Sequence, residues 1–342
     1  MVALTEATAS NKRIAATFPD GLVAVFVGGT SGVGEYTVKA FAKYTRNSRA
    51  YIVGRSEASA TRILDECRAL GPSSTFEFLQ GDISLLNTVD DICKKIQAKE
   101  TAISILFQSQ GTMAVNAVTS EGIPLGVSLS MHSRTRFILN LMPLLQRATS
   151  LRRVVTVLAA TCEGALDVNN LAGIGLSVLQ RRDQLASAQT LLLENIQEKI
   201  PGADSVGYVH DVPGVVQSGI NRDAEGFGIK VMIAVAGLLG PLIRTPIKEC
   251  AEMHLFFATS SRFASGAGSG AADGVPLQGG VEVARGTIGK TGSGVYSVSN
   301  RGEPGPPRAE KALAGLRGDG TATKLWDIVM AQSKKVTGTE SL

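Results

Sequence analysis

Short apolar runs alternate with helix-length segments over the first two thirds of this chain, and this alternation is its most constraining feature. The apolar runs have the length and composition of β-strands, and they lie at 22–27, 50–53, 75–79, 103–107, 154–158 and 206–209. The segments between them have helical length and lie at 32–44, 58–70, 85–98, 125–146 and 176–199. Repeated units of this size predict a doubly wound α/β fold, in which helices cover both faces of a parallel sheet.

The alternation stops after Pro213. Residues 219–248 are rich in glycine and aliphatic residues, which favours a helical flap beside the pocket. Residues 263–308 are rich in glycine and proline and predict an irregular segment with a last strand at 294–299, before a helical tail at 309–335. The sequence therefore predicts three parts, which are a flexible N-terminal segment (1–20), one α/β domain (21–262) and a C-terminal extension packed on that domain (263–342).

Composition excludes several classes of protein. The 34 basic and 30 acidic residues are scattered without a basic block, so nucleic acid is not an expected partner. The four cysteines are far apart and lack metal-ligand spacing, so we expect reduced thiols and no metal site. The first 20 residues lack the apolar core of a signal peptide, and the apolar stretch at 229–243 is too short to span a bilayer. We expect a soluble cytoplasmic protein with a small-molecule substrate, and a homo-oligomer is compatible with the sequence.

A glycine-rich loop joins the first predicted strand to the first long helix. Its sequence, at 25–34, is Val-Phe-Val-Gly-Gly-Thr-Ser-Gly-Val-Gly. A phosphate-binding turn needs glycine where a Cβ atom would block the anion, and it needs free amides at a helix N-terminus. A tight structural turn is the simpler explanation of such a loop, but its place at the first strand–helix junction favours dinucleotide binding. The residues expected to contact the nucleotide here are Gly28, Thr30, Ser31, Gly32, Val33 and Gly34.

Four more motifs follow in order along the chain. They are Gly54-Arg-Ser56 and Gly81-Asp-Ile83 after the second and third strands, Gln108-Ser-Gln-Gly111 after the fourth, and Val212-Pro-Gly-Val-Val-Gln-Ser218 after the sixth. Together with the G-x-x-x-G-x-G spacing of the loop, this set resembles the short-chain dehydrogenase/reductase family over about residues 20–260. The resemblance implies a Rossmann-type fold. The C-terminal part is similar to that of fungal members associated with secondary-metabolite pathways.

The resemblance also implies further contacts with the cofactor. Asp82 and Ile83 would meet the adenine, Pro213, Gly214 and Val216 would meet the nicotinamide, and Gly111 completes the set. Arg55 lies where an acidic residue would otherwise hold the ribose 2′-hydroxyl. A guanidinium can bind a 2′-phosphate through paired hydrogen bonds, so NADP(H) is favoured over NAD(H). The simpler alternative is a solvated arginine at a strand end.

The residues that carry hydride chemistry in this family are missing. The family uses a tyrosine, a lysine four residues later, a serine and an asparagine. No tyrosine of this chain has a lysine at i+4, and residues 171–193 contain neither type. Counting along the predicted elements puts Arg181 and Leu185 at the tyrosine and lysine positions. Ala159 or Ala160 takes the place of the serine, with Thr161 nearby, and Ser130 takes that of the asparagine.

Three residues remain as candidates for catalysis. His210 is expected at the carboxyl end of the sixth strand, where ligands bind in this fold, although a structural histidine there is an equally good interpretation. His132 lies early in the predicted helix 125–146, but it should face away from Ser130 on an ideal helix. Arg181 could hold an anion, or it could be a surface residue. The third histidine, His254, is expected in the core.

These observations leave three functions open. A redox-neutral isomerase or cyclase, acting on a conjugated or aromatic natural product, is favoured by the missing residues. In that case NADP(H) would be bound without being consumed, and His210 or His132 would be the base. An NADP(H)-dependent reductase of a ketone or activated alkene, with an unusual proton donor, is favoured by the glycine loop, Arg55 and Asp82. The third function is a non-catalytic nucleotide-binding protein.

Overall fold

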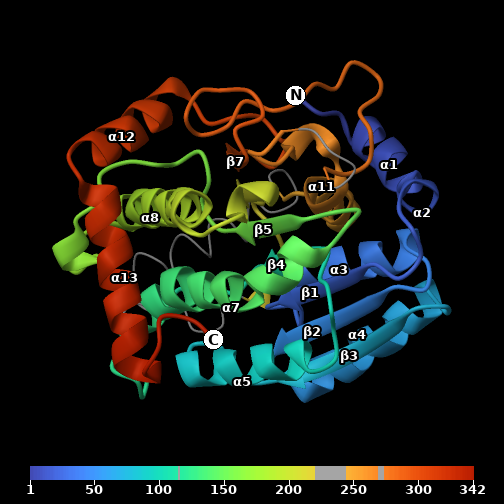
Figure 1. The fold of residues 1–342 in the computed structure, drawn as a ribbon, viewed down its shortest axis with the longest axis horizontal. Coiled ribbons are helices and arrows are strands. Elements are labelled where there is room, and N and C mark those ends of the chain that lie inside the picture. The colour runs from blue at the N-terminus through green and yellow to red at the C-terminus, as the bar shows by residue number, and fades with distance from the viewer. Residues whose placement is uncertain (115, 220–243, 269–272) are drawn as a thin grey trace.

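A parallel seven-stranded sheet forms the centre of the computed structural model, which describes residues 1–114, 116–219, 244–268 and 273–342 (Figure 1). The strand order is β3-β2-β1-β4-β5-β6-β7, and every neighbouring pair is parallel. The strands are β1 (Val23–Val27), β2 (Arg49–Gly54), β3 (Thr75–Gln80), β4 (Ile105–Gln108), β5 (Arg153–Val157), β6 (Gly207–Asp211) and β7 (Val295–Val298). This topology confirms the predicted Rossmann-type fold.

Helices cover both faces of the sheet. One face carries α3 (Gly32–Tyr44), α4 (Glu57–Leu70) and α11 (Ile247–Thr259), whose apolar residues share a core with the strands. The other face carries α5 (Leu86–Gln97), α7 (Ser133–Arg147) and α8 (Val178–Lys199), which share a second core. The central strands are buried throughout, as expected for a sheet with helices on both faces.

The N-terminal segment, expected to be flexible, is helical and packed. It forms α1 (Leu4–Lys12) and α2 (Ile14–Thr17), and α1 packs against α11. Buried Asn11 donates hydrogen bonds to the carbonyl oxygen and the Oε2 atom of Glu252, at 2.9 and 2.7 Å. The sequence did not indicate this packing, because the partner of the segment lies some 240 residues away.

The predicted helix at 125–146 contains a π-helical turn. It runs as α6 (Leu125–Val127), the π turn η1 (Ser128–His132) and α7. A π turn inserts one residue into the helical ladder and therefore shifts the direction of the side chains around it. Ser130 and His132, two of the residues considered for the site, both lie in this turn.

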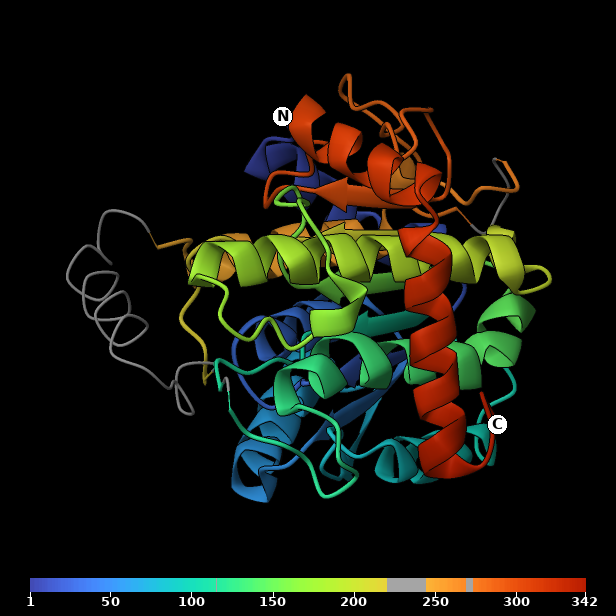
Figure 2. The ribbon, with the colours of Figure 1, turned by 90° about the vertical axis from the view of Figure 1, so that its left-hand side faces the viewer.

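The C-terminal extension forms a short strand and two helices on the α8 side. After β7, the predicted tail helix divides into α12 (Pro307–Gly318) and α13 (Thr321–Thr337), because Gly320 adopts a left-handed conformation with φ of 78°. Helix α13 runs across α8 toward α5, as Figure 2 shows. The predicted flap at 219–248 lies largely outside the described residues. Within the described ranges, no helix combines the length and apolarity needed to cross a membrane.

Candidate functional site

The glycine loop fills the junction between β1 and α3, where glycine is required by close backbone contacts. Gly28 has a φ of 78°, and a Cβ atom there would lie 2.7 Å from the amide nitrogen of Gln110. A Cβ atom on Gly34 would lie 2.7 Å from the carbonyl oxygen of Gly28. Helix α3 begins at Gly32, and Ser31 makes no side-chain cap hydrogen bond. No side chain at the cap therefore competes with an anion for the first amides of α3.

Next to this loop lies Gln110, whose side chain is buried without hydrogen-bond partners. Gln110 is 5% exposed, and neither its Nε2 nor its Oε1 atom has a partner. Buried amides are normally satisfied, so this side chain points to a ligand that hydrogen-bonds to it. The sequence showed Gln110 only as part of a broken motif, and no signal marked it as a binding residue. An orphaned amide beside a glycine loop fits a bound nucleotide.

The ends of β2 and β3 bring the expected adenosine-side residues to the same edge of the sheet. Gly54 abuts Thr30 of the glycine loop, since a Cβ atom there would lie 2.7 Å from the Thr30 hydroxyl oxygen. The next residue, Arg55, is exposed. Asp82 is also exposed, and it accepts hydrogen bonds from the amide and hydroxyl groups of Ser84. Ile83 points its side chain into the core instead, so any contact it makes with an adenine is through its backbone.

The segment after β6 lies across the start of α3. A Cβ atom on Gly32 would lie 2.6 Å from the Cβ atom of Ser218, and the Tyr36 hydroxyl donates to the carbonyl of Gln217 at 2.8 Å. Gly214, with a φ of 73°, allows the turn that brings this segment over the loop. The structure thus brings the expected residues Pro213, Gly214 and Val216 into the segment that crosses α3, and Gly111 follows directly after Gln110 on the β4 side.

Each position considered for the missing hydride chemistry has a local structural partner or an apolar side chain. Half-buried Arg181 donates from Nε to the carbonyl oxygen of Gly173, at 2.8 Å, and Leu185 lies one turn later on α8. The hydroxyl of Ser130 donates to the carbonyl of Gly126, four residues earlier. Ala159 and Ala160 are buried at the end of β5. The side chains of Ala159, Ala160 and Leu185 have no proton to transfer, and those of Arg181 and Ser130 are held by backbone carbonyls.

His210 lies inside the protein and not in an open pocket. Its side chain is fully buried, and its Nε2 atom accepts a hydrogen bond from the amide of Ala159 at 3.2 Å. Its Nδ1 atom therefore carries the proton and donates to the Thr190 hydroxyl, 2.8 Å away. Burial, together with the nearby Arg134 guanidinium, lowers the pKa of His210 to about 3. This geometry favours the structural interpretation of His210 over the catalytic one.

Comparisons with known proteins agree with the fold and the loop. The family model "short chain dehydrogenase" matches residues 22–149. Over 333 residues, the chain is 33% identical to Oxidoreductase AN1596 from Emericella nidulans, and the match covers 96% of each chain. The chain belongs to the short-chain dehydrogenase/reductase family. It is a divergent fungal-type member of that family.

Two more relatives and two solved structures extend this picture. The chain is 31% identical to Oxidoreductase andH from Emericella variicolor and 28% identical to Short-chain dehydrogenase/reductase SAT2 from Stachybotrys chartarum, with 93% and 92% of those chains covered. It shares its fold with the NADP complex of Pseudomonas aeruginosa RhlG, at a TM-score of 0.52, 18% identity and coverage of 77% and 96% of the two chains. An NADP-bound 3-oxoacyl (acyl-carrier-protein) reductase from Agrobacterium tumefaciens gives a TM-score of 0.53 at 18% identity, covering 72% and 90%.

A buried carboxyl group that the sequence did not single out holds the loop after β5. Oε1 of Glu163 accepts hydrogen bonds from the hydroxyls of Thr190 and Ser297, and Ser297 in turn accepts from the amide of Thr161. Thr161 has a φ of 68°, an unfavourable conformation for a β-branched residue. Burial raises the pKa of Glu163. This network joins β6, β7 and α8 to the loop at the family's serine position, and only the tertiary fold brings its members together.

The two remaining histidines lie on opposite sides of the sheet. His254 of α11 pairs with Asp211, with 2.8 Å between Nε2 and Oδ2, and both side chains are buried. The expected core position of His254 is therefore confirmed, and Asp211 points away from the face that His210 occupies, as neighbouring strand residues do. His132 is 2% exposed and turns toward α13, where Val329 is its backbone hydrogen-bond partner. The structure does not bring His132, His210 and Arg181 together.

Proposed function

We propose that this protein is an NADP(H)-dependent oxidoreductase that acts on a small natural product and lacks the tyrosine–lysine pair of its family. One observation supports the proposal: the glycine loop lies between the ends of β2 and β4 and the segment after β6, as a dinucleotide site requires, while both candidate histidine bases are buried. The relatives named as oxidoreductases cover nearly the whole chain, which supports the same conclusion.

The residues that would hold NADP(H) come from four strand ends. The first amides of α3 would hold the pyrophosphate, with Thr30 and Ser31 beside them, and the Gln110 amide would hydrogen-bond to the nucleotide. Arg55 would bind the 2′-phosphate, and the segment from Pro213 to Val216 would flank the nicotinamide. The bound cofactor supplies or accepts a hydride, and the protein has to orient the substrate and manage one proton.

The lack of a proton donor limits which substrates can be reduced. Without an acidic group near neutral pKa, reduction is easiest when the hydride acceptor forms a stabilised anion, as a conjugated enone or quinone does. Water can then protonate that anion, and Arg181 would steady its negative charge. We therefore propose a conjugated carbonyl compound as substrate, with one hydride added at carbon and one proton taken from solvent.

A redox-neutral isomerase or cyclase is the second candidate, and the lack of tyrosine and lysine in residues 171–193 favours it. Its histidine version requires a side chain that can reach the substrate. His210 has both ring nitrogens hydrogen-bonded and no exposed surface, while His132 lies at α13, among residues that do not include the glycine loop or the strand ends around it. Arg181 and water would have to carry that chemistry instead.

Hydride transfer distinguishes the two candidates. We expect purified protein, incubated with NADPH that carries two deuterium atoms at C4 and a panel of conjugated enones and ketones, to give a product that contains one deuterium bound to carbon. One NADPH would be oxidised per product molecule, as followed by nicotinamide absorbance and mass spectrometry. Conversion of any compound to an isomer of equal mass, with NADPH left intact, would establish the redox-neutral enzyme instead.

A further inference from the structure

An open cavity lies beside α13, away from the glycine loop. It has a volume of about 320 Å³ and is lined by residues of α13, of the segment at 122–127 and of the loop at 168–174, together with His132. None of its lining residues belongs to the glycine loop or to the strand ends described above. This volume falls at the lower end of the range found for pockets that bind small organic ligands.

His132 gives this cavity an unsatisfied polar group. It lines the cavity, is 2% exposed, and its Nδ1 atom has no hydrogen-bond partner. A buried polar atom without a partner is unusual in a native structure and calls for a hydrogen-bonding ligand. A hydroxyl group can either donate to Nδ1 or accept from it, so it satisfies this atom in either tautomer of the ring.

The rest of the cavity is mainly apolar, and its rim is unusually exposed. Leu171, Val127 and Ile123 line its interior. Two isoleucines at its edge are exposed, Ile174 by 78% and Ile328 by 37%. Apolar side chains gathered at the mouth of a cavity favour a ligand that covers them.

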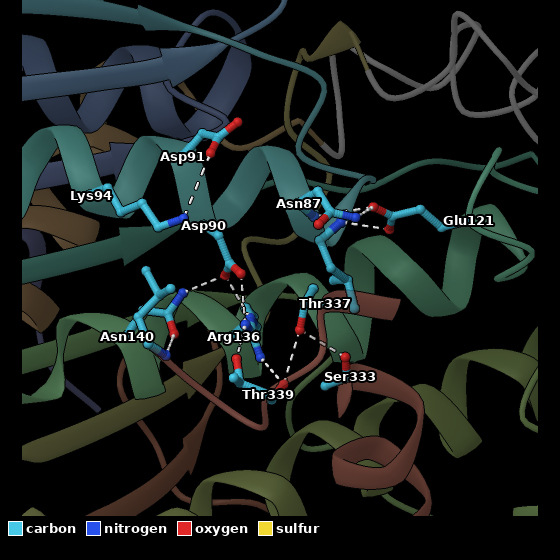
Figure 3. Close-up of polar contacts among 12 residues, drawn as sticks. Asn87, Asp90, Asp91, Lys94, Glu121, Arg136, Asn140, Ser333, Thr337 and Thr339 are labelled. Carbon is cyan, nitrogen blue, oxygen red and sulfur yellow. Dashed lines mark hydrogen bonds and ion pairs between the residues drawn. The ribbon is translucent and has the colours of Figure 1, made fainter. Parts of the chain in front are cut away.

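The helix that roofs the cavity is firmly attached at its C-terminal end. Arg136 of α7, whose side chain is fully buried, forms a bidentate pair with Asp90 of α5, with both nitrogen–oxygen distances at 2.7 Å. The same guanidinium donates to the carbonyl oxygen of Thr339 at 2.7 Å, just beyond α13 (Figure 3). Asn140 donates to Asp90 and accepts from the amide of Leu342. These contacts fix α13 over η1, so the cavity is a built feature of the fold.

We infer that this cavity binds a small apolar molecule carrying a hydroxyl group, with the hydroxyl hydrogen-bonded to Nδ1 of His132. The site is separate from the proposed nucleotide site, so its ligand binds whether or not NADP(H) is present. Its ligand class, an apolar alcohol or phenol, follows from the unpartnered buried nitrogen of His132 and the apolar walls.

The test uses 4-propylphenol as the probe and propylbenzene as its counterpart without a hydroxyl. Trp326, the one tryptophan of the chain, lies on α13 two residues before Ile328 of the cavity lining, so its fluorescence is one measurement of binding, with calorimetry as the second. We expect saturable 1:1 binding of 4-propylphenol with a Kd below about 1 mM, both with and without saturating NADPH. The wild-type protein should bind propylbenzene several-fold more weakly than 4-propylphenol, since one buried hydrogen bond is lost. For the same reason, His132→Phe should bind 4-propylphenol several-fold more weakly than the wild-type protein does.

A variant that fills the cavity with a larger side chain tests where the ligand binds, and a matched variant outside the cavity is its control. Ile328→Trp should abolish binding, because the larger side chain enters the mouth of the cavity, while Asp327→Trp, at an exposed neighbouring position outside the lining, should not. Binding that survives in Ile328→Trp, or no saturable binding of 4-propylphenol to the wild-type protein, would overturn the proposal.

Discussion

Lowering the pH from 6.5 to 5 is expected to reduce the free energy of unfolding by about 3 kcal/mol. Burial lowers the pKa of His210 to about 3, with Arg134 contributing, and lowers that of His132 to about 4 despite the hydrogen bond to Val329. In the unfolded chain both imidazoles titrate near 6.5. Below that pH the unfolded state binds two protons that the folded state does not, so stability falls as the pH decreases.

His254 has the opposite effect, on the alkaline side. Burial alone would lower its pKa, but the Asp211 carboxylate raises the pKa of His254 well above 6.5. Its stabilising contribution is fully present below pH 6.5 and is lost as the pH rises through the raised pKa. These three histidines together predict a maximum of stability near pH 6.5.

Urea unfolding at several pH values measures this directly. In the double variant His132→Gln/His210→Gln, the dependence on pH between 6.5 and 5 should nearly disappear, whereas His254→Gln should flatten only the alkaline side. Equal stability of the wild-type protein at pH 6.5 and pH 5 would show that these two imidazoles are not buried as described.

The variant Arg136→Leu is expected to lose about 3–5 kcal/mol of stability, because it leaves the Asp90 carboxylate buried without its charged partner. It also removes the hydrogen bonds that hold Thr339. We propose that the C-terminal extension (263–342) unfolds together with the α/β domain (21–262), so the loss should occur in one cooperative transition in urea.

Two variants test the cause of that loss. Arg136→Leu/Asp90→Leu removes both charges and should recover a large part of the stability. Arg68→Leu breaks an exposed pair with Asp65 and should cost less than about 1 kcal/mol. If Arg136→Leu lowers the free energy of unfolding no more than Arg68→Leu does, the buried pair of Arg136 with Asp90 does not stabilise the fold as we expect.

The sequence predicted the parts of this protein whose signals are local. Strands and helices of the α/β domain were recognisable because periodicity and glycine positions depend on neighbouring residues, and the loop at Gly28–Gly34 was found for the same reason. The packed N-terminal helices were missed because their partner, α11, is remote in the sequence. The π turn at Ser128–His132 has no simple sequence signal, so the direction of His132 could be inferred only roughly.

The chemistry of the site was harder to predict than its fold. The sequence placed His210 at the right end of the right strand, but not the surroundings that bury it, since Thr190 and Ala159 come from other elements. Gln110 and Glu163 were not singled out, because an unpaired amide and a buried carboxyl group are recognised only when the packing around them is known. Tertiary contacts, not residue identity, decide these roles.

Binding of NADPH is the most direct test of the central claim, that the loop between β1 and α3 holds NADP(H) for this oxidoreductase. Calorimetry should show 1:1 binding of NADPH to the wild-type protein, tighter than binding of NADH. In Arg55→Ala the affinity for NADPH should fall about 10- to 100-fold, as expected for lost hydrogen bonds to a charged phosphate, while NADH is little affected. The control Arg68→Ala, at another exposed arginine, should leave both affinities unchanged. Failure of NADPH to bind the wild-type protein would contradict the account, and an unchanged preference in Arg55→Ala would contradict the role of Arg55.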